Sequence, residues 1–179
     1  IGRAARRGIV FRGGQVIDNV ARLETVAFDK TGTLTSSKPD FVGVMMPNGV
    51  QTDINDSKRV CEFLGIKNYE VNIKGAYDAL TQEITAKIAG EATPQFKTNT
   101  PSRLRMATLY GVAAIIGNCR ISNNGNKSER LMGYFTIWGD GAGDFAPLAN
   151  LYVSDVVRLG IELGLPEDLV KKAPSDGMC

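Results

Sequence analysis

Two acidic motifs in this 179-residue sequence carry the residue types needed for phosphate and metal chemistry. The first, DKTGTLT, begins at Asp29, directly after the apolar run at 25–28. A carboxylate at a strand end, followed by a lysine, threonine hydroxyls and a glycine turn, can act as a nucleophile toward phosphate. The second motif, GDGAGD, carries Asp140 and Asp144. If the two motifs meet in the fold, these three aspartates can form a magnesium-dependent phosphoryl-transfer site.

The composition excludes several other kinds of site and partner. The sequence contains no histidine, which rules out Ser-His triads and histidine metal ligands. Its three widely spaced cysteines include no CxxC pair, which favours reduced thiols in a cytoplasmic protein. No apolar run approaches the roughly 18 residues that cross a bilayer. The net charge is +2 and no aromatics are interleaved with the N-terminal arginines, so we expect neither a membrane nor a nucleic-acid partner.

Alternating strands and helices must position the two motifs. The apolar patterns predict strands at about 24–28, 41–46, 69–73 and 119–121, and helices at about 53–64, 76–88, 99–116 and 152–163. A loop rich in Gly and Asp is expected between the last strand and the last helix. This order predicts an α/β fold with a mostly parallel sheet flanked by helices. Ligands would then bind beyond the carboxyl ends of the strands.

The helix expected at 99–116 has the strongest local signals. Asn99 and Thr100 resemble a cap, and Pro101 suits the first helical position. The predicted inward face of this helix consists of four apolar residues: Leu104, Ala107, Ala114 and Ile115.

The segment at 2–39, GRAARRGIVFRGGQVIDNVARLETVAFDKTGTLTSSKP, resembles the phosphorylation-site region of heavy-metal P-type ATPases. The resemblance implies that Asp29 accepts the γ-phosphate of ATP, with magnesium neutralising the charges. The sequence shows neither transmembrane helices nor the nucleotide-binding domain motifs of such pumps. The GDGAGD motif is also similar to the ATPase pattern GDGxND, with Gly143 in place of the asparagine.

From about residue 42 onward the sequence resembles ammonia-dependent NAD synthetases. The matching stretches occur in family order and are VGVMMPNGVQTDINDSKRVCEFLGIKNYEVNI, NTPSRLRMATLYGVA, NKSERLMGYFT, GDGAGDFAPLANL and LGLPEDLVKKAPSDGMC. The resemblance implies an adenine-nucleotide α-hydrolase-like fold and a cytoplasmic homodimer. It also implies an enzyme that uses ATP and Mg²⁺ to activate deamido-NAD, which ammonia then converts to NAD.

The resemblance assigns roles to individual positions. Arg103 would hold deamido-NAD, although an arginine on a helix surface is the alternative. Glu129 would bind Mg²⁺, or it could simply favour the start of a helix. Asp144 would contact the substrate, or could bond backbone groups in its own loop. Ser175 would contact ATP or serve as a turn residue, and Asn124 stands where a hydroxyl residue is expected to contact AMP.

Several features depart from the synthetase pattern. The pyrophosphate-binding loop Ser-Gly-Gly-x-Asp-Ser is absent, and Ile137 stands where a lysine is frequent. We therefore expect an ATPase-like segment at 1–41, with an atypical strand and loop, joined to a synthetase-like domain at 42–179 that is truncated at its C-terminus. This arrangement suggests a chimera with impaired NAD synthesis. The alternatives are haloacid-dehalogenase-like phosphoryl transfer through Asp29, with Asp140 as a metal ligand, and a non-catalytic nucleotide-binding or dimerisation module.

Overall fold

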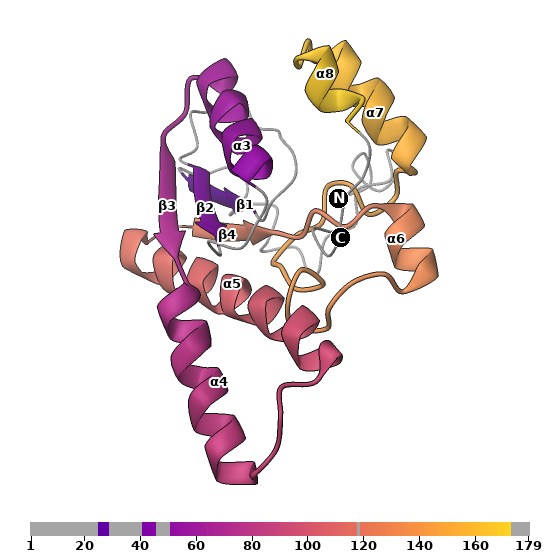
Figure 1. The fold of residues 1–179 in the computed structure, drawn as a ribbon. Coiled ribbons are helices and arrows are strands. Elements are labelled where there is room, and N and C mark those ends of the chain that lie inside the picture. Colours follow the sequence, from indigo (N-terminus) through magenta and orange to yellow (C-terminus); the bar gives the residue numbers. More distant parts are fainter. Residues whose placement is uncertain (1–24, 29–40, 46–50, 118, 173–179) are drawn as a thin grey trace.

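The computed structural model describes residues 25–28, 41–45, 51–117 and 119–172 (Figure 1). Strand β1 (Thr25–Phe28) pairs in parallel with β4 (Cys119–Ser122). Strand β2 (Phe41–Met45) pairs in parallel with β3 (Asn68–Asn72), and β1 and β2 lie in contact with each other. The predicted parallel pairing is confirmed, and the strand positions agree with the sequence pattern to within a residue or two.

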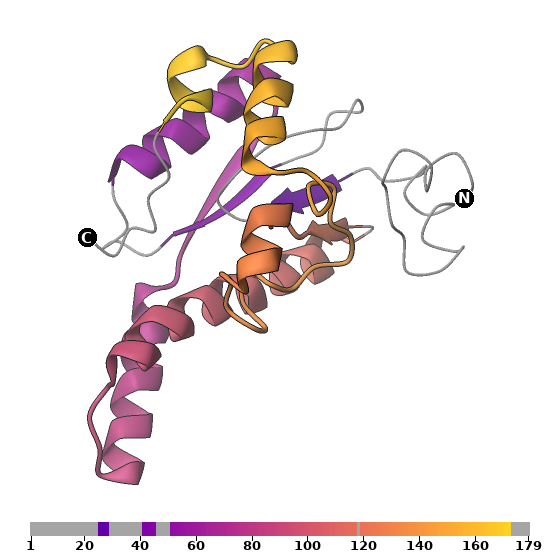
Figure 2. The ribbon, with the colours of Figure 1, turned by 90° about the vertical axis from the view of Figure 1, so that its right-hand side faces the viewer.

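Helices cover both faces of the strands. Helix α3 (Gln51–Leu64) contacts β2, and it ends at Gly65, whose φ of +63° is the left-handed conformation expected after a helix. Helix α5 (Pro94–Ile116) contacts β2 and β4 and lies on the opposite side of the strands from α3 (Figure 1). Helix α4 (Lys74–Ile88) projects away from the body of the molecule in both views (Figures 1 and 2). The layered α/β arrangement is thus the one that the alternating elements predict.

Helix α5 begins earlier than the sequence pattern suggests. Its N-cap is Thr93, whose hydroxyl accepts a hydrogen bond from the Phe96 amide at 3.1 Å, and Pro94 occupies the first helical turn. Pro101 therefore lies inside the helix, and the prediction that it marks the start was wrong. The sequence contains two successive signals of a cap followed by proline. The earlier one begins the helix, because the later proline removes only one backbone hydrogen bond from a helix that packing supports on the sheet.

The inward face of α5 also differs from the prediction. Ser102, Met106 and Leu109 are buried, whereas Ala107 is exposed and the Ile115 side chain is 88% exposed. Apolar residues occur on nearly every side of this helix, so their spacing did not select one face. The face that packs includes the polar Ser102, which an apolar pattern cannot identify.

Three shorter helices follow β4 within the residues that the structure describes. Helix α6 (Lys127–Met132) lies within the region predicted as a loop. Helix α7 (Val153–Glu162) is followed by α8 (Glu167–Val170), and Gly164 between them has a φ of +73°. The predicted helix at 152–163 is confirmed. None of the helices within the described ranges is long and apolar enough to cross a membrane.

A small core joins α5 to β4 and to the loop that follows α6. Met106 and Leu109 of α5 pack with Ile121 of β4, and Ala142 of the loop packs against this cluster. Leu109 and Ile121 are fully buried. This core fixes the carboxyl end of β4 relative to the loop that contains GDGAGD, and the candidate site lies there.

Candidate functional site

A cavity of about 270 Å³ lies beyond the carboxyl end of β4. It is bordered by the connection from β4 to α6, by α6 itself and by the loop between α6 and α7. Among the described residues, its lining consists of two carboxylates, an arginine, an amide, an aromatic ring and two glycines: Glu129, Asp140, Arg130, Asn123, Phe135, Gly125 and Gly141. The position agrees with the expectation that ligands bind beyond the strand ends.

The connection from β4 to α6 is built from buried polar groups. Ser122 is fully buried and donates a hydrogen bond to Asn124 Oδ1 at 2.8 Å. The side-chain oxygen of Asn124 therefore accepts a hydrogen bond from within the connection. Asn123 is 5% exposed, and its Oδ1 accepts a hydrogen bond from the Gly125 amide at 2.9 Å. The Asn123 amide donates to the carbonyl of Phe145 at 2.7 Å. These hydrogen bonds connect the end of the strand to the GDGAGD loop.

Glu129 takes part in a capping box at the start of α6. Its Oε2 accepts a hydrogen bond from the Asn126 amide at 2.8 Å, and its own amide donates to Asn126 Oδ1 at 3.0 Å. This is the helix-start role that the sequence offered as an alternative. Because Oε1 accepts no hydrogen bond from any other described residue, one oxygen of this cavity-lining carboxylate is left for a ligand.

The two aspartates of GDGAGD have different environments. Asp140 lines the cavity, and its Oδ1 accepts hydrogen bonds from Ser102 Oγ at 2.8 Å and from the Thr136 amide at 3.0 Å. Asp144 does not line this cavity, and its Oδ2 accepts a hydrogen bond from the Ile121 amide at 2.8 Å. Asp144 thus bonds to the backbone of β4 and not to that of its own loop, whereas Asp140 is the aspartate that borders the cavity.

Asp144 also affects a neighbouring phenol. Tyr110 Oη donates to Asp144 Oδ1 at 3.4 Å. Burial raises the pKa of Tyr110, and the charge of Asp144 and this hydrogen bond raise it further. All three effects favour the neutral phenol, so Tyr110 acts here as a hydrogen-bond donor.

Gly143 explains why the GDGAGD loop can approach β4 so closely. Its φ is +151°, and a Cβ atom at this position would lie 2.6 Å from the backbone nitrogen of Asn123. A side chain at 143 would therefore displace the main chain of the β4–α6 connection. The ATPase pattern carries asparagine at this position, and this backbone has no room for it.

Arg103 contacts the loop and is not among the residues that line the cavity. It is exposed, and its Nε donates a hydrogen bond to the carbonyl of Ile137 at 3.1 Å. The same loop presents Trp138, which is 78% exposed and has a positive φ of +65°. The guanidinium helps to hold the loop, and its two terminal nitrogens form no hydrogen bond or ion pair with other described residues.

Two of the predicted site residues, Asp29 and Ser175, lie outside the described residues. The predicted meeting of Asp29 with Asp140 and Asp144 is therefore untested and stays a prediction. Within the described part of the chain, no group of three or more acidic or cysteine side chains is arranged to hold a metal ion. Mg²⁺ is commonly bound by one or two carboxylates together with substrate phosphates, and Glu129 and Asp140 suit that mode of binding.

Sequence reasoning missed three polar residues of this region. Asn123 and Arg130 line the cavity, and Ser102 bonds to Asp140 from the buried face of α5. The polar run Ser-Asn-Asn directly after a predicted strand was a usable signal for Asn123, because strand ends are where ligands bind. No comparable signal exists for Ser102, which is distant in sequence from the loop that it contacts.

Comparison with known proteins points to one family. The sequence matches the family model described as NAD synthase over residues 8–179. It is 38% identical over 154 residues to the NH(3)-dependent NAD(+) synthetase of Pyrococcus horikoshii, covering 86% of this chain and 57% of the relative. It is 34% identical over 174 residues to that of Pyrococcus furiosus, covering 97% of this chain and 63% of the relative. The chain thus spans about three fifths of the length of these relatives.

Solved structures agree with the sequence match. The NMN synthetase of Francisella tularensis superposes with a TM-score of 0.75 at 31% identity, covering 88% of this chain and 69% of that chain. The NH3-dependent NAD synthetase of Campylobacter jejuni, solved with a nitrate ion, gives a TM-score of 0.71 at 27% identity, covering 90% and 73% respectively. The fold class predicted from the resemblance is confirmed. The family match begins at residue 8, so it also extends over most of the stretch that resembles P-type ATPases.

Proposed function

Since this chain belongs to the NAD synthase family, we propose that it is part of an ammonia-dependent NAD synthetase that amidates deamido-NAD with ATP and Mg²⁺. The observation that carries the proposal is the family match over residues 8–179, joined to a cavity at the carboxyl end of β4 that is lined by Glu129 and Asp140. In this reaction the nicotinate carboxylate attacks the α-phosphorus of ATP and pyrophosphate leaves. Ammonia then attacks the carboxyl carbon, and AMP leaves with the bonding electron pair.

We propose a role for each polar group in this chemistry. Glu129, through Oε1, would hold the Mg²⁺ that screens the charge of the phosphates, with Asp140 as a second carboxylate. The terminal nitrogens of Arg103 suit the phosphates of deamido-NAD. Ser175 and Asn124 would contact ATP, and both assignments rest on the family resemblance alone.

We further propose that this chain by itself turns over slowly. The motif Ser-Gly-Gly-x-Asp-Ser does not occur in the sequence. A glycine-rich loop of this kind supplies backbone amides that neutralise a polyphosphate, so its loss weakens binding in the transition state as well as the ground state. The segment at 1–41, read as ATPase-like and joined to the synthetase domain at 42–179, stands in the sequence where that loop is expected.

The direct test combines calorimetry with turnover. ATP with Mg²⁺ and deamido-NAD are each titrated into the full chain, and the NAD, AMP and pyrophosphate formed with ammonia are quantified. We expect binding of both nucleotides, weaker Mg²⁺-dependent ATP binding in Glu129→Gln, and little NAD. Absence of binding by either nucleotide would contradict the proposed function. Robust NAD formation would contradict only the proposed impairment.

A second substrate is favoured by one structural neighbour. The Francisella protein named NMN synthetase is 31% identical to this chain and has a TM-score of 0.75. Nicotinate mononucleotide carries the same carboxylate as deamido-NAD and lacks the adenylyl half, so the same activation chemistry applies. Including it in the assay decides between the two substrates by their relative kcat/KM.

Phosphoryl transfer through Asp29 is an alternative activity. DKTGTLT is a highly specific motif, and a carboxylate can act as the nucleophile toward phosphate. Trapping of beryllofluoride with Mg²⁺, lost in Asp29→Asn, would support this alternative. Failure to trap it in the wild-type chain would remove it. Nucleotide binding without either reaction would favour a non-catalytic module.

We also propose that the chain forms a homodimer in the cytoplasm. Six large apolar residues between 131 and 138 are more than 40% exposed: Leu131, Met132, Tyr134, Phe135, Ile137 and Trp138. An apolar surface of this kind favours association. Sedimentation equilibrium on the full chain measures the oligomeric state, and a monomer at all accessible concentrations would contradict the dimer.

A further inference from the structure

Three residues on one side of α5 fasten the loop that contains Asp140. Asn99 Oδ1 accepts a hydrogen bond from Thr136 Oγ1 at 2.8 Å, and Arg103 Nε donates to the Ile137 carbonyl at 3.1 Å. Ser102, between them, bonds to Asp140 itself. Positions 99, 102 and 103 are neighbours on a helix surface, because residues three and four apart project from the same side. Helix α5 thus holds three points of one loop.

The contact between Ser102 and Asp140 is reciprocal, and its serine is buried. Ser102 Oγ donates to Asp140 Oδ1 at 2.8 Å and accepts from the Asp140 amide at 3.1 Å. A hydroxyl has one donor and two acceptor positions, so both bonds can exist at once. Ser102 is only 3% exposed, which prevents water from replacing it easily. The hydroxyl therefore fixes both the backbone and the carboxylate of Asp140.

The backbone next to Asp140 is shaped to admit this hydroxyl. Gly139 is buried, and a Cβ atom at this position would lie 2.3 Å from Ser102 Oγ. Even alanine at 139 would push Ser102 away from Asp140. The close approach of α5 to the loop therefore depends on glycine at 139 as well as on serine at 102.

The two oxygens of the Asp140 carboxylate consequently have different roles. Oδ1 accepts two hydrogen bonds, from Ser102 Oγ and from the Thr136 amide at 3.0 Å. Oδ2 accepts none from the rest of the described chain, and Asp140 lines the cavity. A carboxylate oxygen without an internal partner at a cavity wall is available to an N–H or O–H group of a ligand or to a cation.

We propose that Ser102 is a positioning residue, which orients Asp140 so that Oδ2 is the oxygen presented to the ligand in the cavity. The identity of that ligand rests on the proposed function, under which it is deamido-NAD or Mg²⁺. The orienting role itself does not, because it concerns contacts within the chain. The two parts are therefore tested by separate measurements.

Amide hydrogen exchange on the full chain tests the orienting role. The informative group is the Thr136 amide, which donates to Asp140 and not to Ser102. In Ser102→Ala we expect its exchange to accelerate about tenfold, because the freed carboxylate leaves Oδ1 out of reach of this donor. Thr108→Ala is the matched control, since that hydroxyl on the same helix bonds only to the Leu104 carbonyl. Exchange at Thr136 within twofold of wild type in Ser102→Ala would overturn the proposal.

Asp140→Asn separates holding the loop from contacting the ligand. The amide oxygen can still accept from Ser102 and Thr136, so exchange at Thr136 should stay within about twofold of wild type. The NH₂ group that replaces Oδ2 cannot accept a hydrogen bond or bind a cation, so the ligand should be lost. Accelerated exchange at Thr136 in Asp140→Asn would contradict this division of the carboxylate.

Calorimetry of the same variants identifies the ligand. For the group that Oδ2 contacts, either deamido-NAD or Mg²⁺ alone, we expect about tenfold weaker binding in Ser102→Ala, and ATP binding without Mg²⁺ should change by less than twofold. Equal weakening of all ligands would indicate general loss of structure and would contradict a positioning role. If wild type binds none of these ligands, the proposed function fails, while the exchange measurement still decides the role of Ser102.

Discussion

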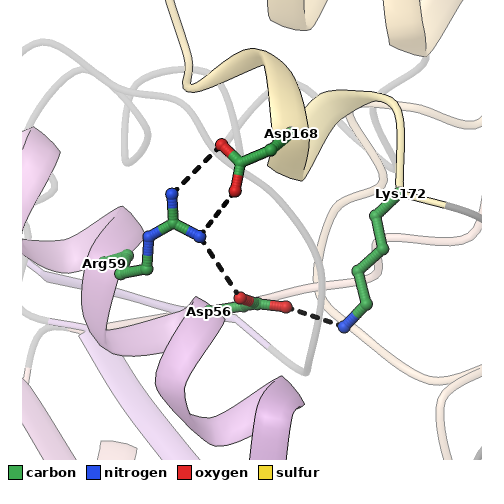
Figure 3. A network of polar contacts seen from close by, with 4 residues as sticks. All are labelled: Asp56, Arg59, Asp168 and Lys172. Carbon is green, nitrogen blue, oxygen red and sulfur yellow. Dashed lines mark hydrogen bonds and ion pairs between the residues drawn. The ribbon is translucent and has the colours of Figure 1, made fainter.

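Two parts of this molecule are held together by contacts of opposite character. Helix α5, β4 and the GDGAGD loop are joined by buried hydrogen bonds and close glycine contacts, as between Ser102 and Asp140 and between Gly143 and Asn123. Helices α3 and α8 are joined instead by charged side chains at the surface (Figure 3). Buried polar contacts are costly to leave unsatisfied, whereas exposed ion pairs contribute little. The candidate site therefore depends on the first kind of contact, and the second can vary with little loss.

The surface network in Figure 3 has four members. Arg59 makes a bidentate contact with Asp168, at 2.7 Å from Nη1 and 3.1 Å from Nη2, and its Nη1 lies 3.6 Å from Asp56. Asp56 in turn contacts Lys172 at 2.7 Å. The side chains of Arg59 and Asp168 are 45% and 63% exposed, so water and salt compete with each contact.

The largest expected effect comes from adding a methyl group to the buried part. In Gly143→Ala the new Cβ would meet the Asn123 backbone nitrogen at 2.6 Å, and the positive φ disfavours any side chain. We expect the free energy of unfolding to fall by about 3 kcal/mol, from overpacking together with backbone strain. Chemical denaturation measures it.

Gly133→Ala is the matched control for this change. Its φ of +66° also disfavours a side chain, but no atom lies within 4 Å of the added Cβ. We expect a loss of about 1 kcal/mol, from the backbone conformation alone. Equal losses of stability in the two variants would show that the cost in Gly143→Ala does not come from the close contact between the loop and the β4–α6 connection.

An intermediate effect is expected at Asp144. Its Oδ2 accepts the hydrogen bond of the Ile121 amide at 2.8 Å, at a residue that is fully buried. In Asp144→Ala this donor loses its partner, and we expect destabilisation by about 1.5 kcal/mol. Asp144→Asn keeps an oxygen acceptor for this amide and should lose less stability than Asp144→Ala. If deamido-NAD binding falls in Asp144→Asn while stability is unchanged, Asp144 contacts the substrate directly, as the family resemblance implies.

The sequence predicts the elements of this fold better than the contacts between them. The strands at 25–28 and 41–45 follow from short apolar runs, and Gly65 and Gly164 mark helix ends because only glycine adopts their positive φ freely. The inward face of α5 could not be predicted, because apolar residues surround that helix. Its start was misplaced because Pro94 and Pro101 carry the same local signal, and only packing decides between them.

The candidate site was likewise predicted in its motifs but not in the contacts between them. The family resemblance pointed to Glu129 and to the GDGAGD loop, and both border the cavity. Asp140, the aspartate of that loop that lines the cavity, bonds to a hydroxyl 38 positions away in sequence, at Ser102. Local pattern carries no information about such a contact. The family resemblance therefore identified the motif, and the fold distinguished Asp140 from Asp144.

The smallest expected effect comes from breaking the surface network, and this effect should depend on pH. The hydrogen bond from Arg59 lowers the pKa of Asp168, and the guanidinium charge lowers it further. A carboxylate with a lowered pKa in the folded state adds stability above its unfolded pKa of about 3.9 and loses this contribution as the pH falls through the folded value. In Arg59→Met we therefore expect a decrease in Tm of at most about 2 °C at pH 7. This difference should shrink toward pH 3 and in 1 M NaCl.

Lys74→Met is the matched control for Arg59→Met. Lys74 pairs with Asp78 one turn further along α4, so this ion pair does not connect two elements. Its effect should be no larger than that of Arg59→Met. A decrease in Tm for Arg59→Met that exceeded that of Gly143→Ala would reverse the comparison. The attachment of α8 to α3 would then be a main determinant of stability. A decrease that is small and sensitive to salt means that the buried contacts around β4 hold the site in shape without help from this network.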